Sequence, residues 1–141
     1  PDGDQDAATK GYVDGAVDGA LADVTPGYIG AAASTGGGAE KVAAGSATTG
    51  TVTLDCSAAS VFTLSPTGNI TLSPSNVPAS GTACTISVII TMPATLYTVS
   101  MPSGAIWLGS TPTFVASKTA VITMLTVDGG TTWICSAAIQ P

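Results

Sequence analysis

Few side chains of this sequence could perform acid–base, nucleophilic or metal chemistry. There is no histidine among the 141 residues, which removes Ser-His-Asp and Cys-His catalytic sets together with histidine metal sites. Beyond residue 47 the only carboxylates are Asp55 and Asp128, and a glycosidase would need both of them to meet across one cleft. Asp128 lies in an Asp-Gly-Gly stretch, where it is better explained as part of a turn. We therefore expect no enzymatic activity, including cleavage of polysaccharides.

The acidic residues at the start of the chain alternate as they do in calcium-binding loops. Asp2, Asp4 and Asp6 stand at every second position. The sixth loop position, which should be glycine, is Ala7, and the twelfth position, which should be glutamate, is Val13. This pattern favours a flexible acidic segment ahead of a helix. We expect neither a bound metal nor a cofactor.

The cysteines Cys56, Cys84 and Cys135 are widely spaced and form no Cys-x-x-Cys pair. Each lies in or beside an apolar stretch. This favours buried free thiols that pack as small hydrophobic side chains. One disulfide with a third, unpaired thiol is the alternative.

Two aromatic residues, Trp107 and Phe114, lie in a segment that proline and glycine interrupt, residues 101–115. This composition predicts a loop. Aromatic side chains exposed on a loop can stack on a receptor sugar or pack against a neighbouring subunit. We therefore take these two residues as candidate receptor or subunit contacts, and we expect the other large aromatic residues beyond residue 47 in the hydrophobic core.

The composition limits the partners that this chain can have. Hydrophobic residues make up 45% of it and charged residues 9%, and its net charge is −6. Nucleic acids and anionic membrane surfaces are bound through basic residues, so neither is an expected partner. No apolar run is long enough for insertion in a membrane as a helix. Threonine, serine, glycine and alanine replace the usual charged surface residues, which suits burial against other copies of the chain, so we expect an oligomer.

Residues 1–24 carry the pattern of a short amphipathic helix, for which Asp6 is a suitable N-cap. Its apolar residues recur at intervals of three and four positions and form one stripe: Val13, Ala16, Val17, Ala20, Leu21 and Val24. Gly11, Gly15 and Gly19 each cost about 1 kcal/mol relative to alanine inside a helix. Such a helix should be marginal alone, and we expect association of several copies to stabilise it.

The rest of the chain divides in two. Residues 25–47 are rich in glycine and alanine and predict an extended linker. In residues 48–141 apolar and hydroxyl side chains alternate, which predicts a domain of short strands. The apolar positions that alternate in this way and should face its core are Val52, Leu54, Phe62, Leu64, Ile70, Leu72, Ile86, Val88, Ile90, Tyr97, Val99 and Met101.

The last two expected strands form the clearest pair. Thr119–Val127 and Thr131–Ala138 flank Asp128-Gly129-Gly130, which predicts a β-hairpin with a glycine turn. Several short strands separated by proline and glycine predict a mainly β protein, an antiparallel β-sandwich with a short N-terminal oligomerisation helix. Ala120–Val127 is apolar on both faces, so it is either a central strand or a strand covered by a neighbouring subunit.

Two segments resemble virion proteins of tailed bacteriophages. Asp6–Asp14 reads DAATKGYVD and resembles the DAATKxYVD segment of tail fibres and related virion proteins. The part from Gly68 to Trp133, with GNITL, PASGT and DGGTTW, is similar to phage β-sandwich domains that carry these motifs in this order. The resemblance implies a homotrimer with a helical neck and a jelly-roll-like knob, located in the virion.

The resemblance also implies a function. It is that of a structural, trimeric tail-fibre or spike module that contributes to host attachment, with other phage structural proteins and a host surface glycan or protein as partners. The chain departs from a typical fibre because it lacks a long shaft repeat. This departure leaves a second function open, that of a capsid decoration protein that stabilises the phage head through broad apolar contact.

Overall fold

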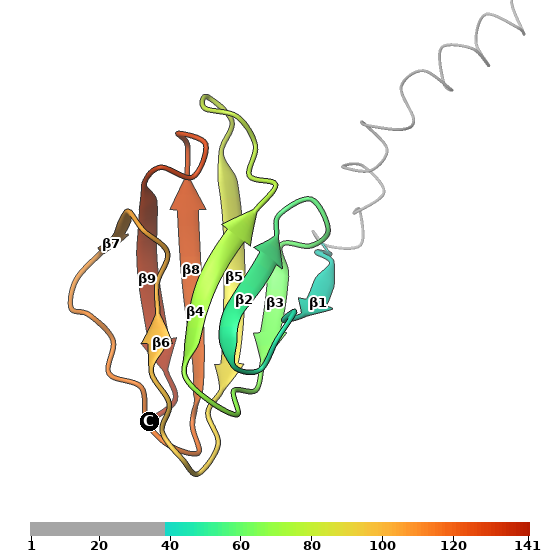
Figure 1. Cartoon of the computed structure of the whole chain (residues 1–141). Helices are drawn as coiled ribbons and strands as arrows, with labels where there is room; N and C mark the ends of the chain where they lie inside the picture. The colour runs from blue at the N-terminus through green and yellow to red at the C-terminus, as the bar shows by residue number, and fades with distance from the viewer. Residues whose placement is uncertain (1–38) are drawn as a thin grey trace, which may run out of the picture. The chain divides into compact units, whose positions relative to one another are not determined.

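The computed structural model describes residues 39–141. The helix expected over residues 1–24, with its stripe from Val13 to Val24, lies outside the described residues, as does the expected linker up to residue 38 (Figure 1). The described range contains strands and no helix: β1 (Val42–Ala44), β2 (Gly50–Asp55), β3 (Val61–Leu64), β4 (Ile70–Ser75), β5 (Cys84–Thr91), β6 (Val99–Ser100), β7 (Ala105–Trp107), β8 (Thr119–Thr126) and β9 (Trp133–Ile139).

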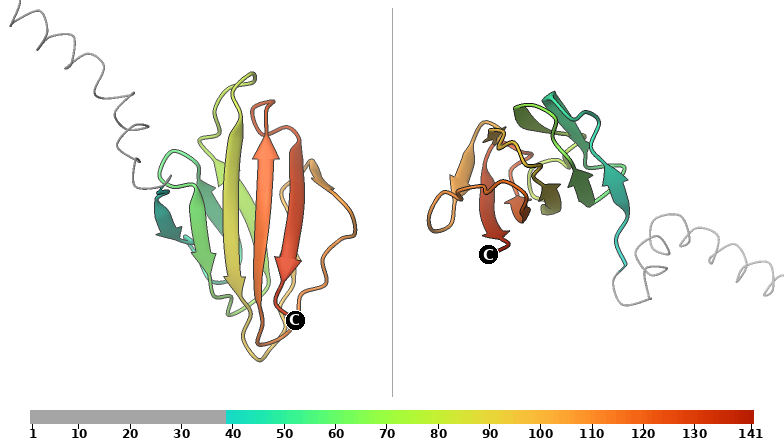
Figure 2. Two further views of the ribbon diagram at one scale, coloured as in Figure 1. Left: turned by 180° about the vertical axis from the view of Figure 1, so that it is seen from behind. Right: turned by 90° about the horizontal axis from the view of Figure 1, so that it is seen from below.

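The strands form two sheets, which Figures 1 and 2 show as two layers. The six-stranded sheet has the order β1-β3-β5-β8-β9-β7, and the three-stranded sheet has the order β2-β4-β6. From β1 to β6 the chain places successive strands in alternate sheets. As a result β1, β3 and β5 run parallel in one sheet, and β2, β4 and β6 run parallel in the other. Over residues 42–100 the chain therefore winds around the core, and each connection carries it from one sheet to the other.

The prediction of mainly β structure is confirmed, but the prediction of an antiparallel arrangement is wrong for most of the domain. Five of the seven strand pairings in the described residues are parallel, and only β8 runs antiparallel to its neighbours, β5 and β9. A period of two in the sequence reports which face of a strand is buried, whatever the strand direction. Direction depends on the connections, and the first six connections, from β1 to β7, each carry the chain to the opposite sheet.

Two strands lie in segments that were expected to be irregular. β1 begins inside the range assigned to the linker, residues 25–47, and β7 lies inside the expected loop, residues 101–115. Both are three-residue strands at opposite edges of the six-stranded sheet. They are strands because β3 and β9 supply their backbone partners. Local composition carries little signal for edge strands as short as these.

The hairpin predicted around Asp128 is confirmed, since β8 and β9 pair antiparallel. The Asp128 carboxylate accepts hydrogen bonds from the Thr132 backbone N–H and from the Thr126 hydroxyl, each at 2.9 Å. These hydrogen bonds, the one from Thr132 foremost, lower the pKa of the Asp128 carboxyl. Gly129 and Gly130 have φ of 72° and 87°, a region that favours glycine.

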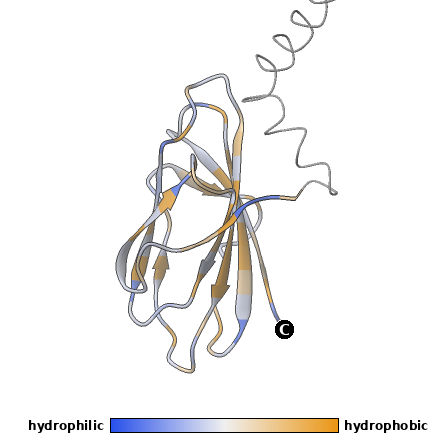
Figure 3. Ribbon diagram, turned by 90° about the vertical axis from the view of Figure 1, so that its right-hand side faces the viewer, coloured by the Kyte–Doolittle hydropathy of each residue, from blue (hydrophilic) through white to orange (hydrophobic). Residues whose placement is uncertain are grey.

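The hydrophobic core takes side chains from both sheets. Most of the alternating apolar residues predicted to face inward are buried: Val52, Leu54, Phe62, Leu64, Ile70, Leu72, Ile86, Val88 and Ile90. Tyr97, Val99 and Met101 are only partly buried, at the edge of the core. Figure 3 shows this alternation as hydrophobic and hydrophilic segments that follow one another along the strands. The hairpin adds Ile122, Met124 and Trp133 to the same cluster. Trp133 is 1% exposed and is the largest fully buried side chain of the described residues.

Candidate functional site

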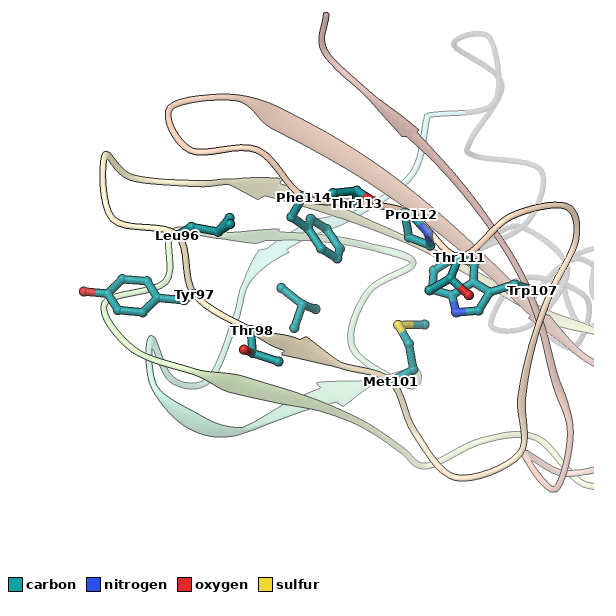
Figure 4. Close-up of a pocket in the computed structure, with 10 residues that line it drawn as sticks. Leu96, Tyr97, Thr98, Met101, Trp107, Thr111, Pro112, Thr113 and Phe114 are labelled. Carbon is teal, nitrogen blue, oxygen red and sulfur yellow. The ribbon is translucent and has the colours of Figure 1, made fainter.

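An open pocket of about 380 Å³ lies between two edge strands, β6 of the three-stranded sheet and β7 of the six-stranded sheet. Its lining comes from β6 and the segments on either side of it, from β7, and from the loop between β7 and β8: Leu96, Tyr97, Thr98, Val99, Met101, Trp107, Thr111, Pro112, Thr113 and Phe114. We call this site the aromatic pocket. In Figure 4 the side chains of Phe114 and Met101 point toward its middle, whereas the Tyr97 ring points outward. The expectation that Tyr97 lies in the hydrophobic core is therefore wrong, since it is only partly buried at the edge of the core.

The unequal width of the two sheets explains where the aromatic pocket lies. The six-stranded sheet extends to β7, whereas the three-stranded sheet ends at β6. Loop residues therefore cover the inner face near β7, and Trp107 and Phe114 pack against the rim of the core as half-buried side chains. Loops pack less regularly than a second sheet, and a hollow remains beside them.

The lining of the aromatic pocket suits a neutral ligand. It offers aromatic and aliphatic surface together with the hydroxyls of Thr98, Thr111 and Thr113. It contains no carboxylate, amine or thiol, so no side chain of this lining is suited to proton transfer near neutral pH. Ligand sites commonly combine apolar walls with a few polar groups that fix orientation. The arrangement can stack and hydrogen-bond a neutral group.

The structure brings together the two residues that the sequence singled out, since Trp107 and Phe114 both line the aromatic pocket. Trp107 does so from strand β7 instead of from a loop. Sequence reasoning missed Leu96, Met101 and the threonines of the pocket. Their positions depend on how two separate loops pack against each other, and no local pattern reports that.

A second hollow, of about 460 Å³, shares only Met101 with the aromatic pocket and is otherwise lined by residues of β2, of β4, of the start of β9 and of other loops. Its lining includes Met101, Pro102 and Ser103 on one side, and Gly130 and Trp133 on the other. Because Trp133 is 1% exposed, this hollow presents little of its aromatic ring. The lining contains no charged residue.

The outer face of the six-stranded sheet carries no charged side chain. Its members alternate with the buried residues of each strand: Val42, Ala44, Val61, Thr63, Thr85, Ser87, Ile89, Thr91, Ile106, Thr119, Val121, Thr123, Leu125, Ile134, Ser136 and Ala138. We call this surface the aliphatic face. Exposed side chains on it include Val121 at 39%, Ile134 at 38% and Ile106 at 54%.

The carboxylates of Asp55 and Asp128 each stabilise a turn by accepting hydrogen bonds. The Asp55 carboxylate at the end of β2 accepts hydrogen bonds from the Ser57 hydroxyl at 2.6 Å, the Asn76 amide at 2.9 Å and the Ser57 backbone N–H at 2.9 Å. The Ser57 hydroxyl and the Asn76 amide are the main causes that lower the pKa of Asp55. Within residues 39–141, no group of three or more His, Cys, Asp or Glu side chains could hold a metal ion.

The three cysteines are free thiols. Cys84 and Cys135 are buried, as expected for small hydrophobic side chains, whereas Cys56 is partly exposed. Burial, together with the neighbouring Cys84 thiol, raises the pKa of the Cys56 thiol to about 12. Burial also raises the pKa of Cys135.

We expect Cys56 to resist alkylation in the folded protein although it is partly exposed. A pKa of about 12 leaves about a thousandfold less thiolate at pH 8 than an ordinary cysteine has, and the thiolate is the reactive form. Iodoacetamide labelling followed by peptide mass spectrometry measures the rate. In urea, which unfolds the protein, the Cys56 thiol should be alkylated at the same rate as the thiol of glutathione. Labelling of Cys56 in the folded protein at the rate of glutathione would contradict this expectation.

No helix among residues 39–141 has the length and hydrophobicity needed to cross a bilayer. No protein-family model, curated protein sequence or solved structure matches this chain.

Proposed function

We propose that this protein is a structural, non-enzymatic component of a bacteriophage virion, a homotrimeric tail-fibre or spike module that contributes to host attachment. The observation that carries the proposal is the segment Asp6–Asp14, DAATKGYVD, which resembles a segment of tail fibres. In this proposal residues 1–24 form the oligomerisation helix and the two packed sheets form a sandwich-like knob. The partners are other phage structural proteins and a neutral host surface glycan or protein.

The aromatic pocket is the part of the knob that we assign to attachment. Trp107 can stack on a sugar ring or an aromatic side chain, and the threonine hydroxyls can hydrogen-bond a neutral partner. Three identical knobs on one trimer would engage a repetitive host surface together. Binding through several sites can exceed the affinity of one site by about 10²–10⁴ without any new contact, so a shallow pocket suffices.

We expect Trp107→Ala to weaken binding of the purified protein to host cells by about 30-fold per site, because loss of a central aromatic contact costs about 2 kcal/mol. Binding of fluorescently labelled protein to cells measures the effect. Leu108→Ala is the matched control, since Leu108 is a neighbouring residue, 64% exposed, outside the pocket lining. Circular dichroism must show that both variants keep their β structure. If Trp107→Ala and Leu108→Ala bound as well as the unsubstituted protein, attachment through this pocket would be refuted.

A second function, that of a capsid decoration protein, is favoured by the aliphatic face. A broad surface without charged side chains suits permanent contact with a neighbouring capsid subunit. A reconstruction of the phage particle separates the two functions. Density for this chain at the end of a tail fibre or spike supports attachment, whereas density on the capsid lattice rejects the fibre assignment in favour of decoration.

A further inference from the structure

We infer that the aliphatic face is the surface through which copies of this chain pack against one another, so that its occupant is a second copy of the same chain. The inference deepens the proposed homotrimer and rests on it for the number of copies. It does not depend on the place of the protein in a virion.

The two outer faces of the domain differ in chemistry. On the three-stranded sheet the outward positions are polar: the hydroxyl side chains of Thr51, Thr53, Thr71, Ser73, Ser75 and Ser100, and the carboxylate of Asp55. On the six-stranded sheet, aliphatic side chains lie next to one another across strands. Leu125 pairs with Ile134 and Ile134 with Ile106, while Ile89 pairs with Val121. A row of hydroxyls, Ser87, Thr123 and Ser136, separates these two aliphatic groups. Hydroxyls remain hydrated at little cost, whereas adjacent aliphatic side chains gain free energy when they are removed from water.

Charge also favours a copy of the same chain as the occupant. The charged side chains of the described residues are Glu40, Lys41, Asp55, Lys118 and Asp128, and all of them lie outside the strands of the six-stranded sheet. A charged partner would lose hydration on this face and find no opposite charge there. The partner surface must therefore be uncharged, and the aliphatic face itself meets that requirement. Two or more such faces can meet without burying an unpaired charge.

The size of the aliphatic face is sufficient for a specific contact. Strands about 4.8 Å apart that rise about 3.3 Å per residue give this sheet a planar area of roughly 500 Å². Two copies face to face would bury roughly 1,000 Å² in total, the lower limit for a specific interface, and three copies that turn this face toward a common axis would bury roughly 1,500 Å² over their three contacts. The strand β8 crosses the middle of this area, between β5 and β9.

The test places positive charge on the aliphatic face of the full chain. In Val121→Lys/Ile134→Lys, each copy would bring two lysines into the contact, since these residues lie on the adjacent strands β8 and β9. Thr71→Lys is the matched control, an exposed residue on the central strand of the other sheet. Light scattering and sedimentation give the mass of each assembly, and circular dichroism reports the fold. We expect a trimer for the unsubstituted chain and for Thr71→Lys. For the double variant we expect a folded monomer, with a dissociation constant raised about a hundredfold or more, because the short glycine-containing helix proposed for residues 1–24 is too marginal to hold the copies together without this face.

The outcomes separate the claim that copies pack through the aliphatic face from the claim that the protein is a homotrimer. If the double variant and also the single variant Val121→Lys keep the mass of an unsubstituted trimer, the inference about the face is overturned and the homotrimer stands. If the unsubstituted chain is a dimer that only the face variants dissociate, the face is supported and the homotrimer fails. A monomeric unsubstituted chain overturns both. If the double variant loses its β signal in circular dichroism, the single variant Val121→Lys takes its place in the test. A dissociated Val121→Lys then supports the inference about the face, and a trimeric Val121→Lys overturns it.

Discussion

Trp133→Ala is expected to lower the free energy of unfolding by about 3–5 kcal/mol, the range for removal of a buried tryptophan. Trp133 begins β9, is 1% exposed and belongs to the core cluster formed by both sheets. Alanine in its place would leave a cavity that the strands cannot close, because β8 holds β9 in antiparallel register. Urea denaturation followed by circular dichroism measures the loss. Since small domains are stable by about 5–15 kcal/mol, this substitution would remove a large part of the total.

Trp107→Ala is the natural comparison for this prediction. Trp107 is half-buried and sits on the short edge strand β7, so its removal leaves a space that water can reach. We expect it to cost less than half as much as Trp133→Ala. Equal losses for the two variants would show that the rim of the core, including the aromatic pocket, contributes as much to stability as its centre, and our division between them would be wrong.

The buried face of the longer strands could be predicted from sequence, whereas the short edge strands β1 and β7 and the strand order could not. Val52, Leu54 and Ile70 were assigned to the core from alternation alone and are buried. Alternation records exposure to water residue by residue, which is a local property. Whether β2 lies beside β4 in parallel or beside another strand depends on connections of similar length and composition. Such connections can close a hairpin or cross to the opposite sheet with little difference in sequence.

The candidate site could be predicted only as separate residues. Trp107 and Phe114 were singled out because proline and glycine surround them, and the structure places both at one pocket. Their pocket partners Leu96 and Met101 come from the two connections on either side of β6. The aliphatic face had a clearer signal, since Ala120–Val127 is apolar on both sides. β8 is a central strand whose outward side chain Val121 is still 39% exposed, so being central does not by itself explain the apolar residues on that side.

Gly104→Ala is expected to lower the free energy of unfolding by about 3–4 kcal/mol, because two penalties coincide at this position. Gly104 has a φ of 82°, where an alanine is strained by about 1–2 kcal/mol. A β-carbon there would also overlap the backbone carbonyl oxygen of Thr131, so the chain before β7 must move away from the chain before β9. That movement weakens the 3.0 Å hydrogen bond from the Trp133 N–H to the Gly104 carbonyl.

Gly81→Ala separates the two penalties. Gly81 has a φ of 94°, and nothing lies within 4 Å of the position that its β-carbon would take. This control should therefore show the backbone strain alone, about 1–2 kcal/mol. Urea denaturation gives both losses, and amide hydrogen exchange at Trp133 should become faster in Gly104→Ala only. If Gly104→Ala and Gly81→Ala lowered the free energy of unfolding equally, the chain around Gly104 would move away from Thr131 without a free-energy cost. In that case β7 would be loosely held, and Trp107 could not be a fixed wall of the aromatic pocket.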